Sequence, residues 1–155
     1  MDEFARRAPL IFGVPRLDTQ HEQLLQLVKE IHAALAQRRP VHELRRLATL
    51  LTLHTRLHFM DEEMFMEGAE YPGLEAHRHR HAEFTEGLLR LQSGLLAPRA
   101  VQFRQIVEYE LRWIHQHLEA EDDELGRWLK ENETFGEYQD WERASDPGSI
   151  PTSRF

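Results

Sequence analysis

Four stretches of the chain carry apolar residues every three or four positions, and this spacing restricts the fold more than any other feature. It places the apolar residues of each stretch on one face of an α-helix. The alternation of apolar and polar residues that marks strands is nearly absent. Proline and glycine interrupt the pattern at Pro40, Tyr71–Gly73 and Gly94–Pro98. Four amphipathic helices with short connections predict an all-α, up-down-up-down antiparallel four-helix bundle.

The bundle is predicted to occupy residues 18–131, between an irregular N-terminal arm over residues 1–17 and a polar C-terminal tail over residues 132–155. Asp18 is the expected N-cap of the first helix. The four helices are expected over about residues 18–38, 41–68, 72–94 and 98–130. In the tail, charge, serine and proline replace the periodic pattern, which argues against a second domain. The aromatic residues that this tail offers for packing on the bundle are Phe135, Tyr138 and Trp141.

The sequence contains no cysteine, which removes disulfides, thiolate zinc sites and cysteine-ligated iron–sulfur clusters at once. Any metal site must therefore use nitrogen and oxygen ligands. The chain has 19 basic and 27 acidic residues and a formal charge of −8, which opposes a general affinity for nucleic acids and anionic membranes. We therefore expect neither a nucleic-acid partner nor a membrane partner.

The location of the protein is predicted from its apolar runs. None of them approaches the ~20 residues that a membrane span needs. Residues 1–9 have no apolar core of the kind that a secretory signal peptide carries. We therefore expect a cytoplasmic protein, and we expect it to be a monomer.

Histidine is the unusual component, with 10 residues among 155, and several of them fall on the inward faces of the predicted helices. His58 and Glu62 are four positions apart, as are His77 and His81, so both members of each pair project from one face of their helix. His21 lies on the apolar face of the first helix. Each of these groups needs a partner, because a buried unpaired polar group costs about several kcal/mol.

The fourth helix adds His117 and Asp122 to this set. They lie five positions apart, which turns the second side chain by about 140° around an ideal helix, so they would approach a site from either side. Together the helices direct five imidazoles and two carboxylates towards one volume. Seven ligands exceed the needs of one tetrahedral zinc. Two six-coordinate ions, bridged by both carboxylates and a solvent oxygen, use all of them and leave one position open.

Four motifs that carry these residues resemble the hemerythrin family, in particular its bacterial members. They are GVPRLDTQHEQLL around His21, HFMDEE from His58, HRHRHAEF from His77 and WIHQHLEAEDDEL from Trp113. The resemblance covers about residues 12–130. It implies a centre of two iron ions bridged by the carboxylates of Glu62 and Asp122. It also implies that one iron is held by His77, His81 and His117, and the other by His21 and His58.

The same resemblance implies reversible dioxygen binding at the iron with two histidines, in an oxygen carrier or store without chemical turnover. Imidazole-rich ligation favours this reading, because carboxylate-rich di-iron sites commonly oxidise substrates. Two alternatives stay open: a sensor of oxygen or redox state, and a di-iron enzyme that acts on peroxide or nitric oxide. An enzyme needs a proton donor near the open iron, and only His54 hints at one.

His54 lies one turn before His58, at a position where the family usually carries a tyrosine. We predict that it is either a hydrogen-bonded core histidine or an additional group near the cluster. Apart from Asp122, the acidic run Glu119–Glu124 is expected to form a solvated helix face. The other histidines expected at the surface are His32, His42, His79 and His115. The residues expected to line the centre with apolar surface are Phe59, Trp113, Ile114 and Leu118.

Overall fold

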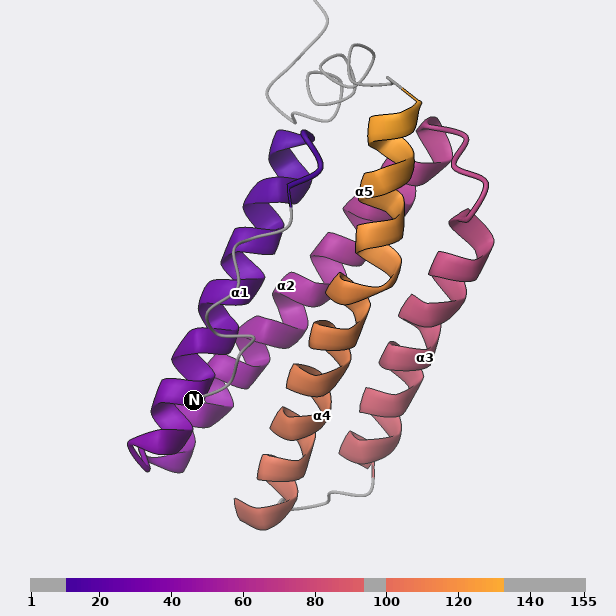
Figure 1. The fold of residues 1–155 in the computed structure, drawn as a ribbon. Coiled ribbons are helices and arrows are strands. Elements are labelled where there is room, and N and C mark those ends of the chain that lie inside the picture. Colours follow the sequence, from indigo (N-terminus) through magenta and orange to yellow (C-terminus); the bar gives the residue numbers. More distant parts are fainter. Residues whose placement is uncertain (1–10, 94–99, 133–155) are drawn as a thin grey trace, which may run out of the picture.

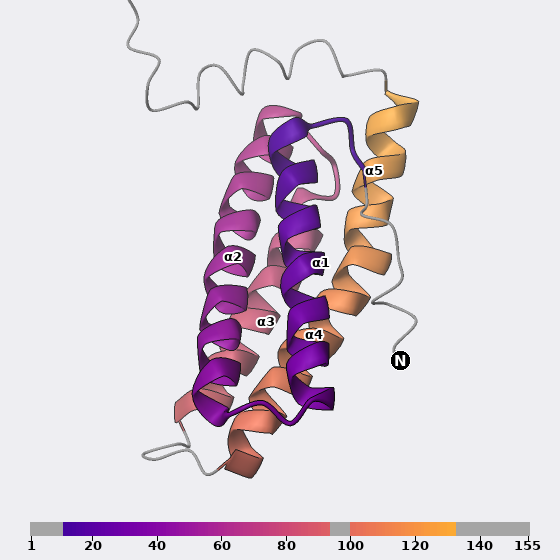
Figure 2. The same cartoon turned by 90° about the vertical axis from the view of Figure 1, so that its left-hand side faces the viewer.

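A computed structural model describes residues 11–93 and 100–132, and all regular structure within these ranges is helical (Figure 1). The helices are α1 (Pro15–Ala36), α2 (Val41–Gly68), α3 (Leu74–Ser93), α4 (Ala100–Glu119) and α5 (Glu121–Glu131). Helices α1 and α3 run in one direction, and α2 and the consecutive α4 and α5 run in the other (Figure 1, Figure 2). The prediction of an all-α, up-down-up-down antiparallel bundle is confirmed.

Helix α1 begins at Pro15, three residues before the predicted start, and its N-cap is Val14. Proline suits the first helical position, because its fixed φ matches the helix and it has no N–H to leave unpaired. The Asp18 carboxylate therefore does not cap the helix from outside. It accepts hydrogen bonds from the backbone N–H groups of Phe12 (2.6 Å) and Gly13 (3.0 Å), which holds the end of the N-terminal arm against α1.

The predicted fourth helix is divided at Ala120, so the expectation of one continuous helix was wrong. Ala120 has φ −111° and ψ −75°, and α5 starts at the next residue. The backbone nitrogen of Ala120 lies 3.0 Å from the carbonyl oxygen of Gln116 and 3.3 Å from that of His117. The second contact spans three residues, as in the tighter 3₁₀-helix. The break lies between His117 and Asp122 and changes the direction in which Asp122 projects.

Three apolar clusters fill the described interior: a larger one in one half of the bundle, a smaller one at the other end, and a third between α2, α3 and α4 that consists of Phe59, Phe84, Leu88 and Ile106. The larger cluster joins α1, α2 and α4, and its fully buried members include Val28, Ile31 and Leu51. The smaller cluster closes the other end of the bundle, where the arm residue Phe12 packs with residues of α2 and α5. Gly126 leaves room for the Phe12 ring, since a Cβ there would lie 3.1 Å from it.

The arm is therefore part of the core as far as the structure describes it, although its backbone is irregular. Among the described residues, no helix is long and apolar enough to cross a membrane. The aromatic residues of the predicted tail lie outside the described residues: Phe135, Tyr138 and Trp141.

Candidate metal centre

All seven side chains proposed from the sequence as metal ligands come together between the larger and the smaller apolar cluster. The antiparallel arrangement brings the start of α1, the end of α2, the start of α3 and the junction of α4 and α5 to one level of the bundle (Figure 1). The seven side chains are 0–3% exposed. They form two groups that share Glu62, one with His77, His81 and His117 and the other with His21, His58 and Asp122.

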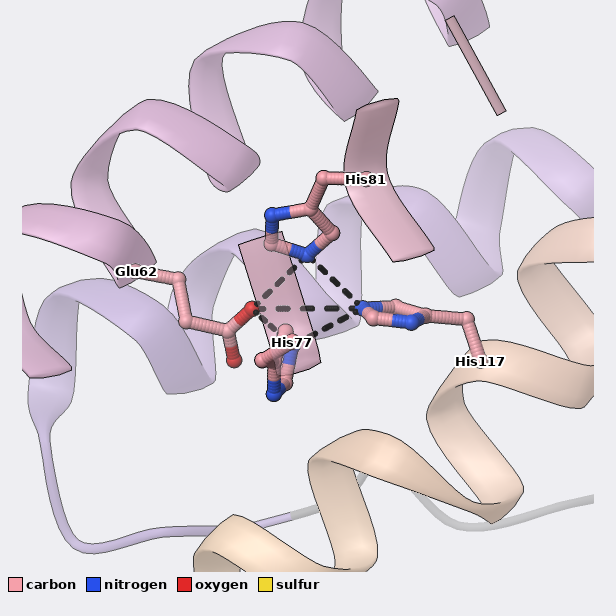
Figure 3. A group of neighbouring side chains, drawn as sticks. All are labelled: Glu62, His77, His81 and His117. Atoms are coloured by element: carbon pink, nitrogen blue, oxygen red, sulfur yellow. Dashed lines mark hydrogen bonds and ion pairs between the residues drawn. The ribbon is translucent and has the colours of Figure 1, made fainter. Parts of the chain in front are cut away.

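The first group gathers three imidazole nitrogens and one carboxylate (Figure 3). The Nε2 atom of His117 lies 3.3 Å from Nε2 of His77 and 3.0 Å from Nε2 of His81. The Glu62 Oε2 atom lies 3.1 Å from the His77 Nε2 and 3.4 Å from the His81 Nε2. Three ring nitrogens and an oxygen thus face one small volume.

Asp122 links the two groups through its two oxygens. Its Oδ1 atom lies 2.8 Å from the His117 Nε2 in the first group, and its Oδ2 atom lies 3.5 Å from the His21 Nε2 in the second. The same Oδ2 is 3.7 Å from the His58 Nε2. Because the helix breaks at Ala120, His117 and Asp122 point towards each other instead of diverging by the angle of a continuous helix. The break therefore brings together two side chains that would diverge on a continuous helix.

The chemistry of this set fits a bound metal. Neither oxygen of Glu62 and neither oxygen of Asp122 accepts a hydrogen bond within the part of the chain that the structure describes. The imidazole nitrogens of His77 and His117 lie 3.1 and 2.8 Å from oxygens of Glu62 and Asp122, so either protons on the imidazoles or a metal cation must compensate the buried charge. Two metal–imidazole bonds of about 2.1 Å at right angles place their nitrogens about 3 Å apart. The Nε2 separations of 3.0 and 3.3 Å agree with that spacing.

Outer acceptors orient several of the imidazoles. The Nδ1 atom of His81 lies 2.7 Å from Glu63 Oε1, that of His117 lies 3.2 Å from Glu121 Oε2, and that of His58 lies 3.2 Å from Gln20 Oε1. A proton held at Nδ1 leaves the Nε2 lone pair facing the centre, as metal ligation requires. The three outer acceptors are Gln20, Glu63 and Glu121, and the contact of Glu121 with His117 is an ion pair, whereas the other two are hydrogen bonds.

Sequence reasoning missed all three outer acceptors. Glu121 was expected on a solvated face, but it also accepts a hydrogen bond from Arg80, and its side chain is only 20% exposed. Its position four residues after His117 was the available signal, because that spacing places two side chains on one helix face. Gln20 precedes a proposed ligand and gave no such signal.

The carboxylates and imidazoles of the cluster shift one another's pKa values. Burial and the Asp122 carboxylate would raise the pKa of Glu62, but the imidazoles of His58, His117 and His77 hold it well below its usual range. Burial would lower the pKa of His77, but Asp122 and Glu62 raise it to about 9. Since metal ligands must be deprotonated, a metal that enters the cluster displaces imidazole protons.

Aromatic rings pack on imidazoles of both groups. Phe59 stacks on His81 with ring centroids 3.7 Å apart, and Trp113 stacks on His117 at 4.5 Å. Phe12, which the sequence did not suggest, meets the His21 ring edge to face at 4.7 Å. Of the four residues expected to line the centre, Phe59 and Trp113 thus touch proposed ligands. The other two, Ile114 and Leu118, belong to the larger apolar cluster.

The remaining histidines lie outside both groups. His54 is half-buried and lines a surface groove with residues of α1 such as Thr19 and Gln23, so the expectation of a core histidine was wrong. It is also not a member of either potential ligand group. Of the histidines expected at the surface, His42 and His79 are exposed and His32 and His115 are half-buried.

A helical bundle that encloses a cluster of histidines and carboxylates defines a class of metal-binding bundle proteins. The comparison with known families narrows this class. The model of the hemerythrin HHE cation binding domain matches residues 13–129, and the chain therefore belongs to the hemerythrin family.

Several known proteins are similar to this chain over much of its length. A bacteriohemerythrin of Stenotrophomonas maltophilia (strain R551-3) is 29% identical over 127 residues, which are 78% of this chain and 78% of that protein. A bacteriohemerythrin of Campylobacter jejuni (serotype O:6) is 25% identical over 120 residues, which are 74% of this chain and 86% of the relative. One from Ralstonia nicotianae is 28% identical over 76 residues, covering 49% and 56% of the two chains.

Proposed function

We propose that this chain binds two iron ions and uses them to bind dioxygen reversibly, as a carrier or store. In this proposal the carboxylates of Glu62 and Asp122 would be shared by both ions. His77, His81 and His117 would hold one iron, and His21 and His58 would hold the other. Membership of the hemerythrin family and the similarity to proteins named bacteriohemerythrin support the proposal.

The single observation that carries the proposal is the division of the seven side chains into two groups joined by carboxylates. Glu62 belongs to both groups, and the two oxygens of Asp122 face different groups. One ion could not use all these donors, whereas a bridged pair can. The group with His21 and His58 supplies one imidazole fewer than the other, which leaves room for a small ligand on that side.

The chain's own residues give the proposed centre a dry setting with little negative charge. The apolar clusters on both sides exclude water, and the Phe12 ring covers one face of His21. Five imidazoles against two carboxylates limit the negative charge, which favours the reduced state of a bound metal. Iron would supply the electrons that reversible dioxygen binding requires.

The enzyme alternative rested on a proton donor at the open side, for which His54 was the candidate. Its position in a groove with Thr19 and Gln23 gives no support to that role. We therefore place oxygen carriage or storage before turnover of peroxide or nitric oxide. A sensor would use the same centre and differ only in what its oxygen-bound form contacts. The proposed setting is a monomer in the cytoplasm.

An oxygen titration of the iron-loaded, anaerobically reduced protein tests the proposal. Two irons per chain and a visible absorption band that appears with oxygen and disappears on its removal, over repeated cycles, are the expected results. A band that decays at once to a permanently oxidised centre would overturn the carrier reading in favour of an enzyme. An iron content of one or none per chain would overturn the di-iron centre itself.

A further inference from the structure

The outer acceptors of the cluster differ in charge between its two groups. His81 and His117, in the first group, face the carboxylates of Glu63 and Glu121. His58, in the second group, faces the neutral amide of Gln20. Whether the acceptor at Nδ1 is an anion or an amide changes how strongly the imidazole donates to a metal at Nε2.

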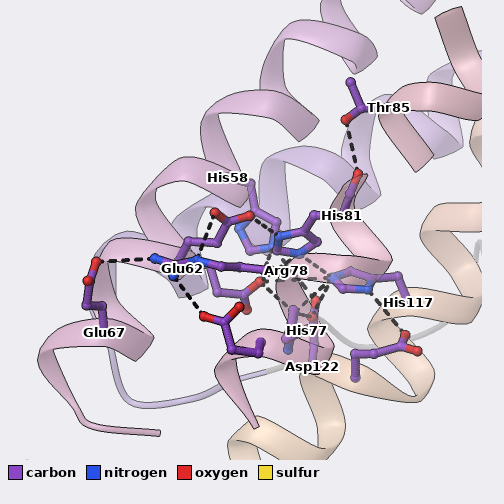
Figure 4. A network of polar contacts seen from close by, with 12 residues as sticks. His58, Glu62, Glu67, His77, Arg78, His81, Thr85, His117 and Asp122 are labelled. Carbon is purple, nitrogen blue, oxygen red and sulfur yellow. Dashed lines mark hydrogen bonds and ion pairs between the residues drawn. The ribbon is translucent and has the colours of Figure 1, made fainter. Parts of the chain in front are cut away.

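On the first group, each outer carboxylate is itself held by an arginine. The Arg80 Nε donates to Glu121 Oε1 at 2.9 Å, and the Arg78 Nε lies 3.5 Å from Glu63 Oε2. Figure 4 shows Arg78 beside the cluster that contains His81 and His117. The order from the surface inwards is arginine, carboxylate, imidazole.

In the second group, an amide lies between the carboxylate and the imidazole. Arg16 donates from Nε and Nη2 to the two oxygens of Asp61, both at 2.8 Å. The Gln20 Nε2 donates to Asp61 Oδ2 at 2.6 Å, which leaves the Gln20 Oε1 facing the His58 Nδ1 at 3.2 Å. Asp61 and Gln20 are 5% and 8% exposed, so the amide has a fixed orientation. The second group thus also has an outer carboxylate, that of Asp61, but Gln20 lies between it and the His58 imidazole.

We propose that Gln20 makes the two metal positions unequal, by denying His58 the anionic acceptor that His81 and His117 have. The position at His21 and His58 then holds its ion less tightly than the position at the three other histidines. Gln20 acts through His58 and is a positioning residue, with Asp61 and Arg16 holding it in place. This inference rests on the proposed di-iron centre and adds the order in which its ions are held.

The smaller number of imidazoles at the second position acts in the same direction, so the test must change the acceptor and leave the ligands alone. The double variant Q20E/D61N exchanges the amide and the carboxylate. The net charge stays the same, and the new amide at position 61 can donate to the new carboxylate at position 20, which reverses the polarity of the original hydrogen bond. A matched control is Q26E/E30Q, because Gln26 donates to Glu30 on the exposed side of α1 at 3.2 Å.

The measurement is the release of ferrous iron from the reduced, fully loaded protein to an excess of a chromophoric chelator, without oxygen. The natural sequence should release its two irons in a fast and a slow phase of equal amplitude. Q20E/D61N should slow the fast phase by about tenfold or more, since outer partners change metal affinity by roughly 10–100-fold. Q26E/E30Q should leave both phases unchanged. E121Q, which turns the anionic acceptor of His117 into an amide, should accelerate the slow phase.

The outcomes separate this inference from the function on which it rests. Uptake of fewer than two irons by the natural sequence overturns the di-iron centre, and the inference with it. Two irons released in a single phase overturn the inference alone. So does a fast phase that Q20E/D61N leaves within twofold of its original rate. If Q20E/D61N loses its helical circular dichroism, E121Q decides alone, and an unchanged slow phase in that variant overturns the inference.

Discussion

The two halves of the bundle differ in the side chains that they bury. Where α1 ends and α2 begins, the interior is aliphatic, with residues such as Ile31, Leu47 and Leu51 at 0–2% exposure. Where α1 begins and α2 ends, the interior contains five imidazoles and two carboxylates at similarly low exposure, next to the smaller apolar cluster that closes this end. We call these the aliphatic half and the cluster half.

The difference shows how one fold carries both stability and chemistry. Aliphatic burial stabilises the aliphatic half at about 25 cal/mol per Å², whatever is bound elsewhere. The cluster half buries charge, which stabilises only when a cation or protons compensate it. We therefore expect metal loading to stabilise the cluster half, and the aliphatic half to be indifferent to metal. Four experiments test this division.

The largest effect is expected for His117→Ala or His77→Ala. Each removes a proposed ligand, so the variant should fail to hold two irons. It should also lose the metal-linked stabilisation, which is about 4 kcal/mol at a thousandfold excess of free metal over Kd. Iron content and thermal unfolding with and without iron measure this. His79→Ala, on the exposed side of α3, is the control. Two irons and an unchanged spectrum in the ligand variants would show that the ligand assignment is wrong.

In the aliphatic half, Leu51→Ala should cost about 3 kcal/mol of unfolding free energy, because it leaves a cavity at a fully buried position. The iron content should stay the same as in the natural sequence. Denaturant unfolding of the iron-free protein and iron analysis of the loaded protein measure the two quantities. Loss of iron from this variant would contradict the independence of the two halves.

Glu110 is the exception in the aliphatic half, and it gives that half a pH dependence. Burial raises its pKa from 4.5 to about 7, although a hydrogen bond from Thr52 opposes the shift. Between pH 4.5 and about 7 the folded protein keeps a proton that the unfolded chain has released, so this group lowers stability as the pH rises. Above pH 7 the buried Glu110 carboxylate lowers the unfolding free energy by its full amount.

Glu110→Gln should therefore stabilise the protein by about 2 kcal/mol at pH 8 and have little effect at pH 4. The shift itself is worth roughly 3 kcal/mol, and unpaired donors of the amide offset part of it. Unfolding free energies of the iron-free protein at both pH values measure the difference. Glu108→Gln, at an exposed position on α4, is the control. An equal effect at both pH values would mean that folding does not raise the pKa of Glu110.

The smallest effect is expected for Asp18→Ala, which releases the end of the N-terminal arm. The variant loses two hydrogen bonds to backbone N–H groups, those of Phe12 and Gly13. We expect a loss of about 1 kcal/mol in the unfolding free energy, measured by thermal unfolding. Asp123→Ala removes a half-exposed carboxylate paired with Arg127 and should change stability less. A larger loss in the control would show that Asp18 does not hold the arm.

Local spacing predicted most of the cluster, because it depends on one helix at a time. The pairs His58/Glu62 and His77/His81 share a helix face at four-residue spacing wherever that helix is placed. The direction of Asp122 could not be predicted in this way, since Ala120 is a strong helix former and gave no sign of a break. Glu110 lies on the apolar face of α4, three residues after Val107, and this position was a signal that sequence reasoning passed over.

The contacts of Gln20 and Asp61 had no such signal. They join α1 to α2 across 41 positions of sequence, and they exist only because the two helices pack with this rotation and register. The same holds for the arm, where an irregular sequence hides the burial of Phe12 against α2 and α5.

The sequence by itself determined the helices, their inward faces and the residues available as ligands, because the backbone hydrogen bonds of a helix repeat locally every 3.6 residues. Only the tertiary structure decided that the four faces meet at one level. It also decided that Asp122 turns back towards His117 and that one imidazole faces an amide while two face carboxylates. These features depend on how separate helices are rotated and shifted against one another, and that arrangement is set by the packing of the whole bundle.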